Sequence, residues 1–175
     1  EPIWARRSDP RSVAMDGAGK VWLTGRVRAA GEQPSFCTDS ENAFADYFPI
    51  ERGTRQAFLY DPETENFSEI DTCFSADHNQ LGEDERFYYG FRDGVGWIDV
   101  EIWEESEDAE AAQGWCPTVL DTNGDGVISQ GWTEPDAPVD PTLDHRIAYG
   151  CYSPAYNKAD GSVWWADNGA EVSER

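Results

Sequence analysis

The stretch DPRSVAMDGAGKVWLT, residues 9–24, carries the strongest fold signal in the chain. Apolar and β-branched residues on both sides of an Asp-Gly-Ala-Gly turn are typical of two antiparallel strands joined by a tight hairpin. Residues 158–166, KADGSVWWA, repeat this arrangement near the other end of the sequence. Gly19 and Gly161 each begin the same Gly-x-Val-Trp pattern, which indicates an internal repeat.

Weaker hairpin signals lie between these two copies. Residues 82–89 form a third copy with an aromatic residue in place of the tryptophan, and residues 96–100 are typical of a further strand. Residues 57–60 and 67–70 predict another hairpin around an Asp-Pro turn. Repeated hairpins of this kind predict an all-β fold, with antiparallel sheets arranged as a β-propeller of about three blades. Unrelated hairpins in a β-sandwich are the alternative.

The copies lie further apart than the roughly 40–50 residues of one propeller blade. Long acidic insertions are therefore expected, and residues 29–50 and 101–146 are the best candidates because they are rich in proline, glycine and carboxylates. We expect residues 1–175 to form a single β-propeller-like domain or fragment, in which the insertion 101–146 carries a calcium loop.

Two of the repeats have a family resemblance. Residues 9–22 and 159–164 resemble the propeller repeat of streptogramin B lyase-like proteins, in which a strand, an Asp/Gly turn and a Val/Leu-Trp strand recur around a ring. Residues 108–148 are similar to an insertion in secreted bacterial members of that family. The resemblance covers about three blades, so it implies a partial chain or an assembly with other copies. No stretch here matches the motif of the lyase's catalytic His and Glu.

The composition excludes several classes of protein. The chain has 35 acidic and 13 basic residues, a net charge of −22, and only two lysines, Lys20 and Lys158. Nucleic-acid binding needs clustered positive charge, which this pattern lacks, and no apolar run is long enough to span a membrane. Eight Trp, seven Tyr and eight Phe predict an aromatic core rather than disorder. The acidic surface suits a salty or cation-rich environment, or simply a soluble secreted protein.

The four cysteines are widely spaced, with no CxxC pair typical of zinc or redox sites. An even number of this kind predicts two disulfides and an oxidising compartment, so we expect a secreted, periplasmic or cell-surface protein. Three pairings are possible. We favour Cys37–Cys73 with Cys116–Cys151, because each bond then closes one loop-rich half of the chain.

Residues 121–129, DTNGDGVIS, form the one sharp chemical motif. The spacing matches the first part of an EF-hand-type calcium loop, in which alternate side chains supply oxygen ligands and Gly126 permits the sharp turn. Trp132 stands where the bidentate Glu should be, so we expect Glu134, or next Asp136, to supply that carboxylate. The alternative is an ordinary Asx turn. The predicted Ca²⁺ ligands are Asp121, Asn123, Asp125, the carbonyl of Val127, and Glu134.

Other signals are weaker. His78 is a candidate general base, although a lone histidine is more often structural. The segment 101–110 holds six carboxylates and predicts a solvated face rather than a second cation site. Asn66 begins a glycosylation sequon. Four potential metal ligands lie in a Pro-rich segment, which favours a loop over a metal site: Asp136, Asp140, Asp144 and His145.

Three functions follow from these features. The first is a secreted calcium-binding β-propeller module with a binding or structural role. The second is a lyase-like propeller enzyme acting on a ligand in the central channel. The third is a subunit of an extracellular assembly or filament, in which neighbouring chains complete the blades.

Overall fold

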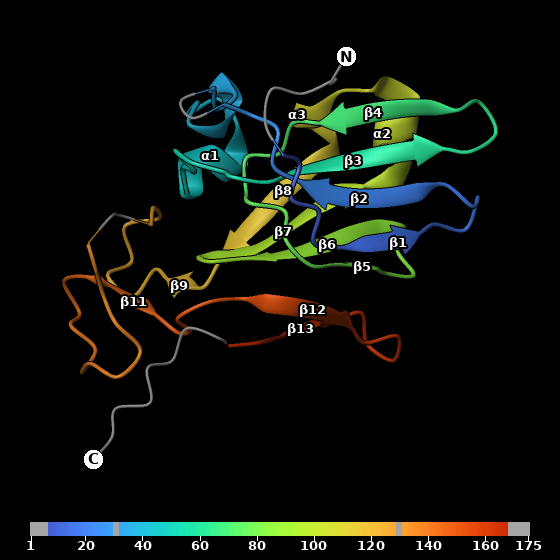
Figure 1. Cartoon of the computed structure of the whole chain (residues 1–175). Helices are drawn as coiled ribbons and strands as arrows, with labels where there is room; N and C mark the ends of the chain where they lie inside the picture. Colours follow the sequence, from blue (N-terminus) through green and yellow to red (C-terminus); the bar gives the residue numbers. More distant parts are fainter. Residues whose placement is uncertain (1–6, 30–31, 129–130, 168–175) are drawn as a thin grey trace.

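The computed structural model describes residues 7–29, 32–128 and 131–167, and its regular structure is mostly β (Figure 1). Two four-stranded antiparallel meanders form its main body. The first sheet contains β1 (Val13–Met15), β2 (Val21–Gly25), β3 (Gln56–Asp61) and β4 (Asn66–Ile70). The second contains β5 (Asn79–Leu81), β6 (Arg86–Phe91), β7 (Gly94–Asp99) and β8 (Gln113–Pro117).

A two-stranded hairpin, β12 (Tyr152–Tyr156) with β13 (Val163–Ala166), lies against the second sheet. A smaller sheet has the order β10 (Trp132–Thr133), β11 (Asp144–Arg146) and β9 (Val119–Leu120), and its β10–β11 pair is parallel. The short helices are η1 (Ser35–Cys37), α1 (Ala43–Tyr47), α2 (Val100–Ser106) and α3 (Ala109–Ala112).

The main core lies between the two four-stranded sheets and is largely aromatic, as the composition predicts. Trp22 on β2 is fully buried and stacks on Phe87 of β6, with ring centroids 4.7 Å apart. The indole N–H of Trp22 donates to the Asp16 carboxylate at 2.9 Å, which satisfies its polar atom. The hairpin turn thus fixes the orientation of the central core residue.

The opposite face of the second sheet packs on the β12–β13 hairpin. Tyr88 of β6 stacks on Tyr156 of β12 with centroids 5.9 Å apart, and Val95 and Cys151 complete this second apolar cluster. Because side chains alternate along a strand, β6 therefore contributes to both cores, with Phe87 on one face and Tyr88 on the other.

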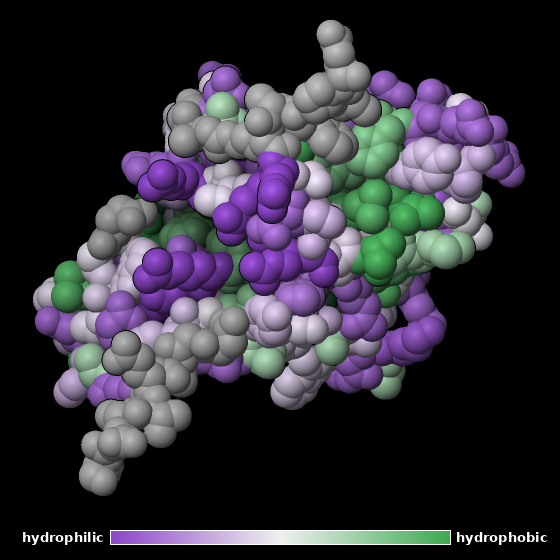
Figure 2. Space-filling model, viewed as in Figure 1, coloured by the Kyte–Doolittle hydropathy of each residue, from purple (hydrophilic) through white to green (hydrophobic). Residues whose placement is uncertain are grey.

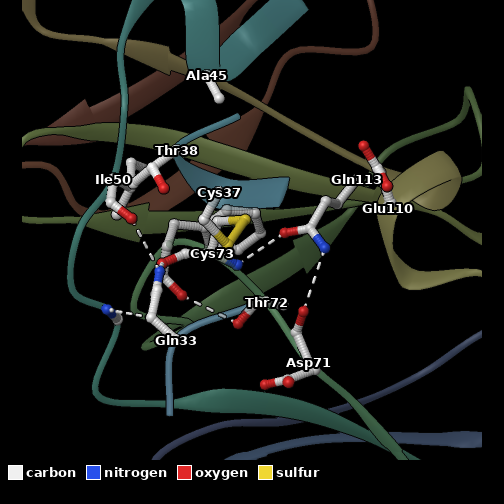
Figure 3. Close-up of a disulfide and its surroundings, with 12 residues drawn as sticks. Gln33, Cys37, Thr38, Ala45, Ile50, Asp71, Thr72, Cys73, Glu110 and Gln113 are labelled. Carbon is white, nitrogen blue, oxygen red and sulfur yellow. Dashed lines mark hydrogen bonds between the residues drawn. A yellow bond between two sulfur atoms is a disulfide. The ribbon is translucent and has the colours of Figure 1, made fainter. Parts of the chain in front are cut away.

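The disulfide joins Cys37 of η1 to Cys73, just after the first sheet (Figure 3). The side-chain amides of Gln33 and Gln113 hold the backbone around this disulfide. Gln33 donates to the carbonyl oxygens of Ile50 and Cys73, at 3.0 and 2.9 Å, and the Cys73 N–H donates to Gln113 at 2.8 Å. The segment 29–50, an insertion between β2 and β3, is thereby fastened to both sheets.

Comparison with the sequence predictions gives a mixed result. The all-β, antiparallel character and the Cys37–Cys73 bond are confirmed. In the described residues no sheet closes into a ring, so a complete propeller is not shown. The segment 101–146 is also more than an insertion, because it supplies β8, the fourth strand of the second sheet.

The expected Cys116–Cys151 bond is absent from the structure, in which both cysteines are free. Cys116 is exposed on β8, and its Sγ lies 3.7 Å from the Pro117 carbonyl oxygen. Cys151 instead packs in the cluster with Tyr88 and Val95. The two thiols nevertheless lie on the same side of the second sheet, since Cys116 is the cross-strand partner of Val95, against which Cys151 packs.

Candidate functional site

The acidic loop at residues 121–128 is held in a tight curve by its first carboxylate. Asp121 Oδ1 accepts backbone N–H groups from Gly124, at 2.6 Å, and Asp125, at 3.2 Å. Asp121 Oδ2 accepts the N–H of Gly126 at 2.9 Å. One side chain thus accepts three successive backbone N–H groups, as a residue at the first position of an Asx-rich loop can do.

The next two oxygen-bearing side chains extend the same pattern. Asn123 accepts the Asp125 N–H at 2.9 Å, and Asp125 accepts the Val127 N–H at 3.0 Å. Gly124 and Gly126 have φ values of 77° and 88°, in the region that favours glycine. No other atom would lie within 4 Å of a Cβ added at either position, so the backbone conformation alone requires glycine there.

Two contacts fix the loop to the body of the protein. The Ile128 side chain is buried, and its N–H donates to the Tyr47 carbonyl oxygen at the end of α1, at 3.0 Å. The Thr122 hydroxyl donates to the Leu143 carbonyl oxygen at 2.7 Å. Burial and the nearby charges of Asp121 and Asp144 raise the pKa of Tyr47, so the loop carries negative potential toward α1.

The loop offers hard oxygen donors, which suit Ca²⁺ better than a transition metal. The structure does not bring the expected fifth ligand to it. Glu134 lies 3.8 Å from the Arg146 guanidinium, and Asp136 accepts the Tyr149 hydroxyl at 3.2 Å. Among the described residues, no three His, Cys, Asp or Glu side chains form a group that could hold a metal on their own.

Glu134 and Asp136 instead line a cleft of about 980 Å³. It adjoins a smaller hollow of about 410 Å³, and the two share Ser75, Phe91 and Arg92. The cleft and the hollow together form a groove. The sequence did not predict it, because its lining comes from segments between Arg11 and Tyr152 that no local motif connects.

The remaining predicted residues have structural partners. His78 Nε2 forms a hydrogen bond of 2.6 Å with the Tyr152 hydroxyl, and its neighbour Asp77 lines the cleft. The loop expected around Asp144 and His145 is in fact strand β11, where Asp144 is fully buried. His145 Nδ1 lies 2.7 Å from the Thr133 hydroxyl.

Most of the acidic segment 101–110 belongs to the helices α2 and α3, and its six carboxylates are exposed, as expected for a solvated face. Asp108 accepts the N–H groups of Glu110 and Ala111 and so caps α3. Glu104 forms a 2.5 Å ion pair with Lys20, which directly precedes β2. Asp140 caps the turn at Thr142, and Asn66 of the sequon is exposed at the start of β4.

Comparison of the chain with protein-family models, with curated proteins and with solved structures finds no match in any of the three. Within the described ranges, no helix has both the length and the apolar character needed to cross a membrane.

Proposed function

We propose that the chain is a secreted calcium-binding module with a binding or structural role. The observation that carries this proposal is the curved loop held by Asp121, in which Asn123, Asp125 and the Val127 carbonyl follow at calcium-ligand spacing. The Cys37–Cys73 disulfide supports an oxidising compartment. Outside cells, such a compartment is also rich in calcium.

Calcium would act on stability through charge. Asp121 and Asp125 repel each other in the empty loop, and an ion at about 2.3–2.6 Å from its ligands would convert this repulsion into attraction. Glu134, or as second choice Asp136, would complete the ligand set. Glu134 would then leave its 3.8 Å contact with Arg146 and bind the ion. The loop joins β9 to β10 and is bonded to α1, so an ordered loop would brace the small sheet against the core.

The experiment is a melting curve recorded with calcium and again with a chelator. At ~100 times the dissociation constant, free calcium should add roughly 2.7 kcal/mol to the free energy of unfolding if the unfolded chain does not bind it. Elemental analysis after dialysis against calcium should find about one ion per chain. Equal midpoints together with no bound calcium would reduce the loop to an ordinary turn.

We also propose that the sheets are blades of a lyase-like propeller. Trp22 pairs with Ala14 and Trp164 pairs with Ala155, so both tryptophans occupy the same place in their hairpins. The first strands of the hairpins β1–β2, β5–β6 and β12–β13 are connected by hydrogen bonds. Ser12, just before β1, donates to Asn79 of β5 at 2.7 Å, and the Tyr156 N–H of β12 donates to Gln80 at 3.3 Å. Figure 1 shows β1, β5 and β12 near one another, as the inner strands of blades would be.

One observation favours the assembly role as a second candidate. Trp164 is 65% exposed, whereas Trp22 at the matching position is covered by the second sheet. In the described part of the chain β13 pairs with β12 alone, so one edge of this hairpin is open. Light scattering across a concentration series tests this role. Association that Trp164→Ser abolishes would support it, and a monomer at every concentration would contradict it.

A further inference from the structure

The groove formed by the cleft and the adjoining hollow has an unusual charge pattern for this protein. Within the described part of the chain, only three basic residues have no carboxylate within 4.0 Å, namely Arg7, Arg11 and Arg52. Arg11 lines the cleft and Arg52 lines the hollow. In a chain with net charge −22, two of these three unpaired arginines thus lie at one groove.

Arg92 adds a third available guanidinium where the two parts of the groove meet. Its side chain is 83% exposed, and its nearest carboxylate, Asp93, is 3.9 Å away. Arg146 holds that same carboxylate at 2.8 Å, so Asp93 neutralises Arg92 only weakly. The guanidinium groups of Arg11, Arg52 and Arg92 can therefore form charge-assisted hydrogen bonds with incoming carboxylates.

Of the carboxylates that line the groove, Asp77, Asp93, Glu134 and Asp136 have partners in the protein, and Glu51, next to Arg52 in the sequence, lines the hollow. Asp77 lies 3.8 Å from Arg55, Glu134 lies 3.8 Å from Arg146, and Asp136 accepts the Tyr149 hydroxyl. They nevertheless bring negative charge into the groove, which would repel a dense polyanion such as polyphosphate or nucleic acid. They can also accept hydrogen bonds from ligand hydroxyl groups. A ligand with sparse carboxylates and many hydroxyls fits both conditions.

Aromatic rings provide the third element of recognition. Tyr149 and Tyr152 line the cleft, Trp132 lines the hollow, and Phe91 lines both. A ligand-binding groove commonly combines such rings with a few polar groups that fix orientation. The two parts together are larger than one sugar ring requires, so the groove has room for an oligomer.

We infer that this groove binds a carboxylated oligosaccharide of the uronate class, with carboxylates at Arg11, Arg52 and Arg92 and hydroxyls at the acidic side chains. The groove shares Glu134 and Asp136 with the calcium proposal but uses neither the loop 121–128 nor an ion, so the inference is tested without calcium. Figure 2 shows strongly hydrophilic residues across the middle of the face in view.

Calorimetric titration with hexagalacturonate tests the inference, in a chelator-containing buffer at about 0.15 M salt, where screening weakens repulsion from the rest of the surface. We expect saturable binding of hexagalacturonate and none of neutral maltohexaose. Arg92→Gln and Arg52→Gln should each weaken binding five- to tenfold. Arg7→Gln is the matched control, because Arg7 is also exposed and unpaired but lies outside the groove lining, and it should change the affinity less than twofold.

Several results would overturn the assignment. Absence of binding at millimolar hexagalacturonate, or equal affinity for maltohexaose, would exclude a uronate site. An equal loss in Arg7→Gln would indicate diffuse electrostatic attraction rather than a groove. Tighter binding of polyphosphate or single-stranded DNA would assign the groove to another class of ligand. Since the buffer lacks free calcium, none of these outcomes depends on whether the loop binds the ion.

Discussion

Trp22 and Trp164 occupy the same register position in two hairpins, yet one is 0% exposed and the other 65%. Each pairs with an alanine and follows a Gly-x-Val sequence. Each indole N–H donates to a side chain of its own turn, Asp16 for Trp22 and Ser162 for Trp164. The local structure is therefore shared. The difference arises because Trp22 faces the second sheet, whereas Trp164 lies on the face of its hairpin opposite to Val163 and Tyr156, which contact that sheet.

This difference predicts unequal costs of substitution. Trp22→Ala should lower the free energy of unfolding by about 3–5 kcal/mol, because it leaves a cavity against Phe87. Trp164→Ala should change it by less than about 0.5 kcal/mol in dilute solution. Urea unfolding of the two variants measures both values. Comparable losses would mean that Trp164 is covered in solution.

The Asp16 carboxylate is expected to stabilise the first hairpin. It accepts the Trp22 indole N–H and the backbone N–H groups of Ala18 and Lys20. Asp16→Ala should cost about 1–3 kcal/mol, since it leaves a buried donor unsatisfied. Asp160→Ala, in the exposed turn of the last hairpin, is the matched control and should cost under about 0.5 kcal/mol. An equal cost in both would contradict the buried role of Asp16.

The Cys37–Cys73 disulfide spans 36 residues of sequence. A loop of this length should lose enough entropy in the unfolded chain to contribute roughly 4 kcal/mol. We expect the double variant Cys37→Ser/Cys73→Ser to unfold at a correspondingly lower denaturant concentration. Cys116→Ser should leave the midpoint nearly unchanged, because Cys116 is exposed and unbonded.

The two free thiols should react at very different rates in the native protein. Burial raises the pKa of Cys151 to about 12, so its reactive thiolate is scarce at pH 8. Exposed Cys116 should be alkylated first, and Cys151 only as the protein opens. Mass spectrometry of alkylated peptides distinguishes the two sites. If the denatured, unreduced chain shows no thiol, the two cysteines are joined after all.

Within the calcium loop, Asp125→Ala should remove most of the calcium-dependent shift in melting temperature. It deletes one charged ligand and the acceptor of the Val127 N–H. Asp140→Ala is the control, because Asp140 caps another exposed turn of the same acidic region at Thr142. A calcium-dependent shift that survives in Asp125→Ala would place the ion elsewhere.

Features that depend on neighbouring residues could be predicted from the sequence alone. The hairpins follow from Asp-Gly turns between apolar runs, and the curve of the acidic loop follows from Asp121, Asn123, Gly124 and Gly126, which interact within a few residues of one another. The aromatic core follows from composition, because aromatic side chains are the main source of buried area in this chain.

Features that depend on contacts between distant segments were decided by the tertiary structure. Cys116 and Cys151 were expected to pair on grounds of number, but in the structure both thiols are free, with Cys116 exposed on β8 and Cys151 buried with Tyr88 and Val95. Glu134 is expected at the loop on grounds of spacing, and only the smaller sheet shows that it lies 3.8 Å from Arg146 in the ion-free structure. The groove needed the second sheet, the smaller sheet and the last hairpin in place. Side chains far apart in sequence converge only once a core has formed, and no local pattern encodes that convergence.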